Sequence, residues 1–159
     1  MTGANMPRCL QRGALFDLAA FIGSIFTTSN IPTWYAALEK PLFAPPNWVF
    51  APVWTAIFTL MGISAYLVWR ESPTDPRVKA ALAVFVLQLA GNVSWSAAFF
   101  GLRSPLAGLL MIVVLWALIA LNIQKFRQIS RTAGALLLPY ILWVSFAAVL
   151  NFAIWRLNL

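Results

Sequence analysis

Two amide and two aromatic side chains recur at helical spacing near the middle of the chain. They are Gln88, Asn92, Trp95 and Phe99, separated by four, three and four residues. At 100° per residue these side chains fall within about 60° of one another on a helix. Aromatic faces with a few amides are typical of a pocket for a large, flat, apolar ligand. The same pattern also fits hydrogen bonds between helices in an ordinary core, and both interpretations stay open.

Two further apolar segments carry aromatic side chains at helical spacing. In the last segment one face about 100° wide contains Tyr140, Trp143, Ala147, Leu150 and Asn151. The small Ala147 leaves room beside the indole of Trp143, one turn away. An earlier segment offers Trp54 and Phe58, again one turn apart. Three helices are therefore expected to direct aromatic side chains toward one another, as a ligand pocket or as core.

The composition leaves little material for metal or acid–base chemistry. The chain has no histidine, one cysteine (Cys9) and four acidic residues. Histidine is the commonest metal ligand and general base, and it is a usual axial ligand of haem. We therefore expect no metal site and no obligatory cofactor, and metal-free tetrapyrroles, sterol-like lipids or planar aromatic molecules fit the pocket better than functional haem. Asp17 is expected in the first turn of a helix, where an acid favours the helix dipole.

The elements that must position these residues are membrane-spanning helices. The 159 residues are 62% hydrophobic and only 9% charged, against about 25% charged in soluble domains. Apolar segments of about 20 residues span a bilayer as helices, which satisfy their own backbone hydrogen bonds. We predict an all-α membrane protein with one domain, residues 1–159, and five transmembrane helices in a bundle. Their expected bounds are about 13–31, 47–69, 79–102, 104–126 and 133–156, with an aromatic- and proline-rich loop between the first two.

Local signals mark the helix ends. Asn47 is a candidate cap for the second helix, and Ser104 followed by Pro105 is a candidate start for the fourth. Residues 72–76 form a polar connection before the third helix, and Pro139 is expected to bend the fifth.

The basic residues set the predicted orientation in the membrane. Eight Lys and Arg residues fall on one side of the five spans and three on the other. The positive-inside rule then places the N-terminus inside and the C-terminus outside. The net charge of +7 is scattered between apolar segments, which favours contact with lipid headgroups and not nucleic acid. Small residues spaced by four, Ala90, Ser94 and Ala98, mark a candidate homodimer contact on the third helix.

Four ordered motifs resemble those of the TspO family, the tryptophan-rich sensory proteins that include the mitochondrial translocator protein. The first two read W-Y-A-A-L-E-K-P at 34–41 and P-P-N-W-V-F-A-P-V-W at 45–54. The third is Q-L-A-G-N at 88–92, followed by Trp95 and F-F-G at 99–101. The fourth is L-P-Y-I-L-W at 138–143, followed by F-A at 146–147 and L-N at 150–151. The resemblance runs from about residue 21 to residue 156, and the fourth helix carries the least of it.

The resemblance implies a five-helix bundle, often dimeric, with a cavity that the first loop covers. The family's ligands are porphyrins and synthetic isoquinoline-type or benzodiazepine-type molecules, so protoporphyrin IX is the expected ligand. Matched by motif, the cavity would be lined by Tyr35, Pro46, Trp54, Phe58, Asn92, Trp95, Phe99, Trp143, Ala147 and Leu150. The family's sterol-recognition stretch requires a tyrosine where this chain has Phe152, so tight sterol binding is not expected.

Three functions follow as hypotheses. The first is a membrane binding protein or sensor for porphyrins and other planar lipophilic ligands. The second is an enzyme that degrades porphyrin in light, with Trp54 and Trp143 as the reacting residues, because an indole stacked on an excited porphyrin could donate an electron. The third is a transporter of lipophilic substrates, although neither inverted repeats nor an ionisable relay is visible in the sequence.

Overall fold

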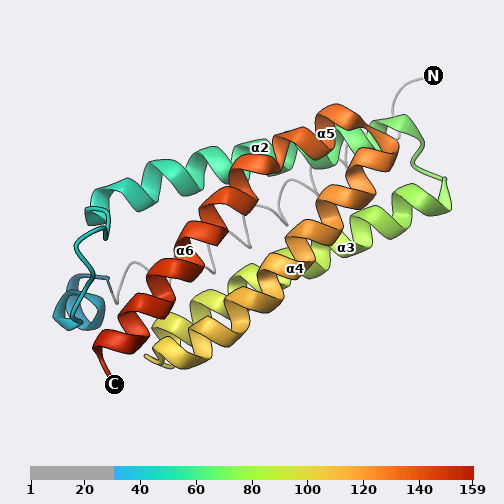
Figure 1. Cartoon of the computed structure of the whole chain (residues 1–159). Coiled ribbons are helices and arrows are strands. Elements are labelled where there is room, and N and C mark those ends of the chain that lie inside the picture. The colour runs from blue at the N-terminus through green and yellow to red at the C-terminus, as the bar shows by residue number, and fades with distance from the viewer. Residues whose placement is uncertain (1–30) are drawn as a thin grey trace.

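The computed structural model describes residues 31–159, and these residues are almost entirely helical (Figure 1). In chain order the helices are a π-helical turn Ile31–Tyr35, a 3₁₀ turn Asn47–Val49, α2 Phe50–Glu71, α3 Pro76–Ser96, a π-helical turn Ala97–Gly101, α4 Pro105–Ile129, α5 Arg131–Leu136 and α6 Leu138–Leu157. The first predicted helix, 13–31, lies outside the described residues apart from its last position. Cys9 and Asp17 lie there too.

Four segments of the described chain are long and apolar enough to cross a bilayer. They are Asn47–Glu71, Pro76–Gly101, Pro105–Ile129 and Arg131–Leu157, close to the bounds predicted for the last four helices. Leu110, Leu142 and Val86 are exposed on their outer faces, as expected of side chains that lipid solvates. The protein is therefore an integral, multi-pass, all-helical membrane protein.

The starts of α3 and α4 are set by side-chain caps. Asp75 accepts a hydrogen bond from the backbone N–H of Arg77 at 2.7 Å, so α3 begins at Pro76, three residues before the predicted start. Ser104 caps α4 as predicted, because its hydroxyl accepts from the backbone N–H of Ala107 at 3.2 Å. The predicted cap at Asn47 is wrong: Pro46 occupies the cap position and no side chain caps that turn.

The last predicted helix, 133–156, is divided in two at Leu137. Pro139 has no N–H and cannot donate to the carbonyl four residues earlier, so the helix breaks there and resumes when Ile141 donates to the Leu137 carbonyl at 3.2 Å. The structure thus divides the helix at the place where a bend was predicted, and the predicted continuity is corrected. The Ser64 hydroxyl then ties α2 to the short α5, donating to the Ala133 carbonyl at 2.7 Å.

The core lies between α2, α3, α4 and α6, and α4 packs against both α3 and α6 (Figure 1). Close approach of α4 depends on Gly108. A Cβ atom built there would lie 2.6 Å from the Phe99 ring and 2.9 Å from the Asn151 carbonyl oxygen. Only a glycine lets α4 come this near to the aromatic end of α3 and to α6.

Candidate ligand cavity between the helices

The connection before α2 packs over the ends of α3 and α6. We call residues 33–40 the lid segment. Its Tyr35 is 3% exposed, with its ring centroid 6.2 Å from that of Phe99 and 6.0 Å from that of Phe100. Trp34 and Tyr35 of the lid segment belong to a buried cluster with the ends of α3 and α6.

Polar contacts hold the lid segment in place at the C-terminal end of α6. The Asn158 carboxamide accepts from the Glu39 backbone N–H at 3.0 Å and donates to the Glu39 carbonyl at 2.9 Å. Lys40 places its ammonium 4.9 Å from the Tyr35 ring centroid and donates to the carbonyls of Ala36 and Leu38, each at 3.2 Å. These contacts close the lid segment without burying its charges.

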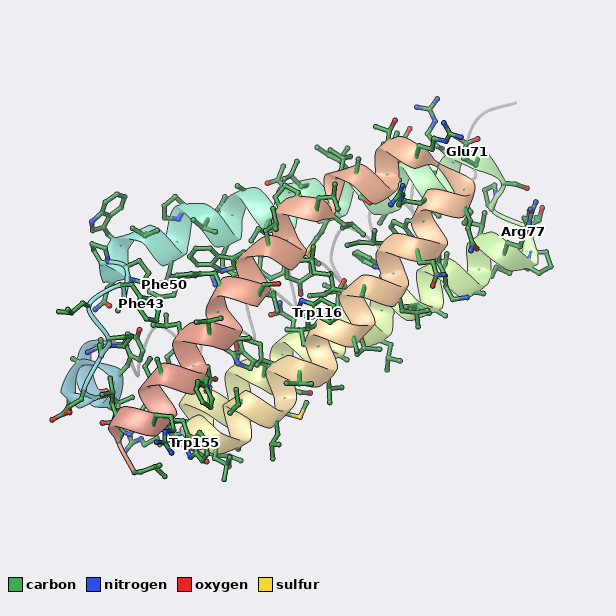
Figure 2. All side chains as sticks on the ribbon, in the orientation of Figure 1. Phe43, Phe50, Glu71, Arg77, Trp116 and Trp155 are labelled. Atoms are coloured by element: carbon green, nitrogen blue, oxygen red, sulfur yellow. The ribbon has the colours of Figure 1, made fainter. Side chains whose placement is uncertain are left out.

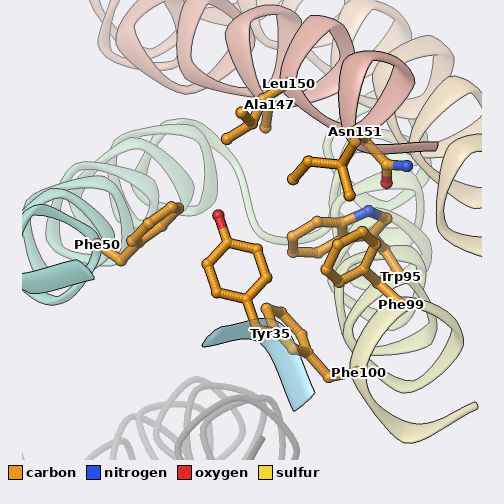
Figure 3. A pocket seen from close by; sticks show the side chains of 9 residues that line it. Tyr35, Phe50, Trp95, Phe99, Phe100, Ala147, Leu150 and Asn151 are labelled. Carbon is orange, nitrogen blue, oxygen red and sulfur yellow. The ribbon is translucent and has the colours of Figure 1, made fainter. Parts of the chain in front are cut away.

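A cavity lies beneath the lid segment (Figure 3). Its free volume is about 30 Å³. The walls come from the lid segment, α2, the end of α3 and α6, and the lining side chains are Tyr35, Phe50, Trp95, Phe99, Phe100, Ala147, Leu150, Asn151 and Ile154. The cavity is therefore narrow in this form and has to expand before a large ligand can enter.

Three buried polar atoms on this apolar wall have no hydrogen-bond partner within the described residues. They are the Tyr35 hydroxyl, the Trp95 indole N–H and the Asn151 carbonyl oxygen. The Tyr35 hydroxyl points into the cavity (Figure 3), and burial raises the pKa of this phenol. The Asn151 amide is fixed because its nitrogen donates to the Pro105 carbonyl at 2.7 Å. Since buried polar groups are normally paired, the Tyr35 hydroxyl, which faces the cavity, is available to a ligand. The Asn151 oxygen lies on the α4 side, 2.9 Å from where a Cβ atom of residue 108 would stand.

Several aromatic side chains pack together where α3 continues into the π-helical turn Ala97–Gly101. Trp95 and Phe99 stack with centroids 5.9 Å apart, and Phe100 meets Phe99 edge-on at 4.8 Å. The turn shifts the helical register, so neighbouring residues Phe99 and Phe100 both face inward. The same shift buries Ala98, whereas Ala90 and Ser94 are exposed. The predicted homodimer contact through these three residues stays a prediction.

The two amides of α3 do not line the cavity but form hydrogen bonds to α6. Gln88 and Asn92 are buried, and their side-chain nitrogens both donate to the Tyr140 hydroxyl at 2.9 Å. The cluster joins α3 to α6 below the cavity. Between the two interpretations of these amides, the structure favours hydrogen bonding between helices, and it places Trp95 and Phe99 in the cavity wall.

Half of the ten residues expected from the family motifs line the cavity: Tyr35, Trp95, Phe99, Ala147 and Leu150. The others are placed elsewhere. Asn92 binds Tyr140, and Phe58 packs beside Trp54 at 5.7 Å in the main core. Pro46 is exposed at the start of the second span.

The two tryptophans expected to react with a bound porphyrin do not line the cavity, and each packs against an aromatic side chain that does. Trp54 has its ring centroid 6.5 Å from that of Trp95. Trp143 lies 5.9 Å from Phe50. Each therefore contacts a side chain that lines the cavity, although neither lines it in this closed form.

Four lining residues are absent from the set that the motifs implied: Phe50, Phe100, Asn151 and Ile154. Phe50 lies four residues before Trp54, and Ile154 lies four residues after Leu150, so helical spacing alone could have found them. Asn151 lies on the predicted face of the last helix. Phe100 could not be found this way, because only the π-helical turn brings it inward.

Spanning helices packed around an apolar core define a class, the multi-pass helical membrane proteins. Comparison with known proteins then identifies the family. The TspO/MBR family model matches residues 13–156, and the chain belongs to this family.

Named relatives agree with this assignment. The chain is 48% identical over 139 residues to the tryptophan-rich protein TspO of Archaeoglobus fulgidus, covering 87% of this chain and 88% of that protein. It is 36% identical over 143 residues to the human translocator protein, covering 89% and 85%. It is 37% identical over 125 residues to the tryptophan-rich sensory protein of Cereibacter sphaeroides, covering 79% and 77%.

Proposed function

We propose that this protein is a membrane binding protein or sensor for porphyrins and other planar lipophilic ligands, which it takes into the cavity under the lid segment. The observation that carries the proposal is the pairing of an aromatic wall with three unpartnered polar atoms, those of Tyr35, Trp95 and Asn151. A free tetrapyrrole presents apolar faces, N–H donors and acceptor atoms. It can therefore stack on the wall and pair with the Tyr35 hydroxyl.

Binding on this proposal is coupled to movement of the lid segment. The free volume of about 30 Å³ is far below the roughly 300–1,000 Å³ of small-molecule sites. Tyr35 is the lining residue that belongs to the lid segment, and a few polar contacts and one aromatic cluster hold that segment down. Its displacement would open the cavity toward the membrane surface while the spanning helices stay in place. A closed form of this kind is expected to bind slowly and to release slowly.

The experiment is a titration of the purified protein in neutral detergent with protoporphyrin IX in the dark, followed by tryptophan fluorescence. Ala147→Leu fills the cavity from α6, so we expect its affinity to fall at least about tenfold, since a blocked pocket costs the contacts it displaces. Ala117→Leu adds the same atoms to the exposed face of α4 and is expected to bind like the wild type. Absence of saturable quenching in the wild type, or equal affinity of both variants, would reject this cavity as the porphyrin site.

A second variant tests separately whether the ligand uses an unpartnered polar atom of the cavity. Tyr35→Phe removes one unpartnered donor and keeps the ring, so affinity should fall by about two- to tenfold, the value of one hydrogen bond. Unchanged or tighter binding would mean that the ligand does not use this hydroxyl.

Light-dependent breakdown of the bound porphyrin is the second candidate function, and one contact favours it. Trp54 lies 6.5 Å from Trp95, so an electron could pass from Trp54 through the wall to an excited ligand stacked on Trp95. The transfer leaves a tryptophan radical cation and a porphyrin radical anion, and breakdown of the ring then requires dissolved dioxygen as the oxidant. Illumination of the dark-bound complex separates the functions. Loss of the porphyrin absorption bands in wild type but not in Trp54→Phe or Trp143→Phe indicates an enzyme, whereas an unchanged spectrum indicates a binding protein or sensor.

A further inference from the structure

A second cavity lies at the opposite end of the bundle from the lid segment. It opens between the beginning of α3 and the end of α4, and its volume is about 500 Å³. The lining residues are Pro76, Arg77, Ala80, Lys125, Gln128 and Ile129. We call it the α3–α4 groove. It shares no lining residue with the cavity under the lid segment, and the porphyrin proposal does not use it.

The groove is amphipathic along its length. Pro76, Ala80 and Ile129 make its apolar surface, while Arg77, Lys125 and Gln128 supply hydrogen-bond donors. Its depth in the membrane is fixed by the spans that form it. One candidate span begins at Pro76 and another ends at Ile129, so the groove lies where hydrocarbon gives way to headgroups.

Of the two cations of the groove, Lys125 has no ion-pair partner in the described chain, and Arg77 is paired on one side only. Arg77 donates from Nε and Nη2 to the Asp75 carboxylate, the latter at 2.9 Å, and its Nη1 has no partner among residues 31–159. Its side chain is 83% exposed at the end of the bundle (Figure 2). Lys125 is half-buried in the groove, and no ion pair is found for it in the described chain. Asp75 therefore orients the guanidinium without neutralising Lys125.

The surrounding charge is also positive. Within the described residues this end of the bundle carries six basic and two acidic side chains, a net charge of +4: Arg70, Arg77, Lys79, Lys125, Arg127 and Arg131 against Glu71 and Asp75. A basic recess between transmembrane helices at the level of the headgroups is a recognised type of anionic-lipid site. Guanidinium and ammonium groups both pair well with a phosphate.

We propose that the α3–α4 groove binds one anionic phospholipid. The phosphate lies between Arg77 and Lys125, Gln128 donates to the glycerol or headgroup oxygens, and an acyl chain runs along Ala80 and Ile129. A lipid satisfies both halves of the groove, whereas free phosphate would leave the apolar half in water. The proposal is therefore a lipid site and not a general anion site.

The experiment counts lipids retained by the purified full-length protein in neutral detergent, using native mass spectrometry. Dioleoyl phosphatidylglycerol and dioleoyl phosphatidylcholine are added at equal concentrations. One basic side chain near a membrane surface contributes about a fivefold preference for an anionic lipid, so two give about 25-fold. We expect one phosphatidylglycerol per chain with that preference in the wild type, and a preference of about threefold or less in Arg77→Gln/Lys125→Gln.

A matched control separates the groove from the overall charge. Lys79→Gln/Arg127→Gln removes the same two charges from the same two helices, each two residues further along and outside the groove. This pair should keep a preference of at least about tenfold. Should the first double variant fail to fold, Arg77→Lys/Lys125→Arg, which keeps both charges, should retain the preference.

Three outcomes overturn the proposal. The first is a wild type without preference for phosphatidylglycerol. The second is an equal loss in the groove and control variants, which would leave only the general charge of the membrane face. The third is displacement of the lipid by inorganic phosphate at an equal concentration, which would make the occupant a free anion.

Discussion

The hydrogen-bonded cluster of Gln88, Asn92 and Tyr140 gives a sharp test of how this bundle is held together. One phenol oxygen accepts from two amide nitrogens, both at 2.9 Å, and all three side chains are buried. The variant Tyr140→Phe removes this oxygen and keeps the ring in its contact with Trp54, whose centroid lies 6.3 Å away. The change therefore isolates the two hydrogen bonds between α3 and α6.

Their value follows from membrane-protein measurements. Hydrogen bonds between transmembrane helices contribute about 0.6 kcal/mol on average and up to about 1.7 kcal/mol each. Two of them give about 1–3 kcal/mol. Loss of the oxygen leaves two buried amides without a partner, and unpaired buried donors carry their full desolvation cost. We therefore expect Tyr140→Phe to lower the free energy of unfolding by about 2–3 kcal/mol, the upper part of this range.

The assay is reversible unfolding in mixed micelles, followed by near-ultraviolet circular dichroism. A triple variant, Gln88→Met/Asn92→Leu/Tyr140→Phe, provides the control, because replacing all polar partners with apolar groups of similar shape is close to neutral. We expect it to recover stability to within about 1 kcal/mol of wild type. A Tyr140→Phe protein as stable as wild type, or a triple variant less stable than Tyr140→Phe, would refute the reasoning.

Other variants test the close packing, the lid segment and the α3 cap. Gly108→Ala places a methyl group 2.6 Å from the Phe99 ring, so thermal unfolding should show a loss of about 1–3 kcal/mol, whereas Gly62→Ala, with nothing within 4 Å, should be neutral or slightly stabilising. Asn158→Ala removes both bonds to the lid backbone, and stopped-flow displacement should show ligand release about three- to tenfold faster. Hydrogen bonds from Arg77 lower the Asp75 pKa, so the ionised cap stabilises α3 at neutral pH and this contribution is lost as pH falls through the lowered pKa. The melting temperature of Asp75→Asn should change less over that acid range than that of wild type.

The spanning helices could be predicted from the sequence because their signal is local. Each apolar segment has to satisfy its own backbone hydrogen bonds in lipid, which leaves a helix as the structure of each. The cap at Ser104 and a disturbance of the last helix at Pro139 were predicted for the same reason, since each depends on one residue and its neighbours. The start of α3 was predicted three residues too late, because the capping residue Asp75 lies within the polar connection before it.

Only half of the residues predicted to line the cavity were found to line it. Helical spacing correctly brought Trp95 and Phe99 to an inward face, where Tyr35 of the lid segment packs against Phe99. The same spacing placed Asn92 beside them. It could not show that the Asn92 amide would donate a hydrogen bond to a tyrosine 48 residues away. Spacing along one helix predicts which way a side chain points. It does not predict which residue of another helix that side chain will contact.

By itself the sequence determined the membrane class, the helical segments, the family and the aromatic faces, because lipid solvation and helical periodicity act within single segments. Only the tertiary structure decided which of those faces enclose space. The π-helical turn turns Phe100 inward, Gly108 lets α4 approach, and Asn158 holds the lid segment over Tyr35. The α3–α4 groove likewise pairs Arg77 with Lys125 across 48 residues. These arrangements depend on contacts between helices, whose geometry is set by packing and not by local periodicity.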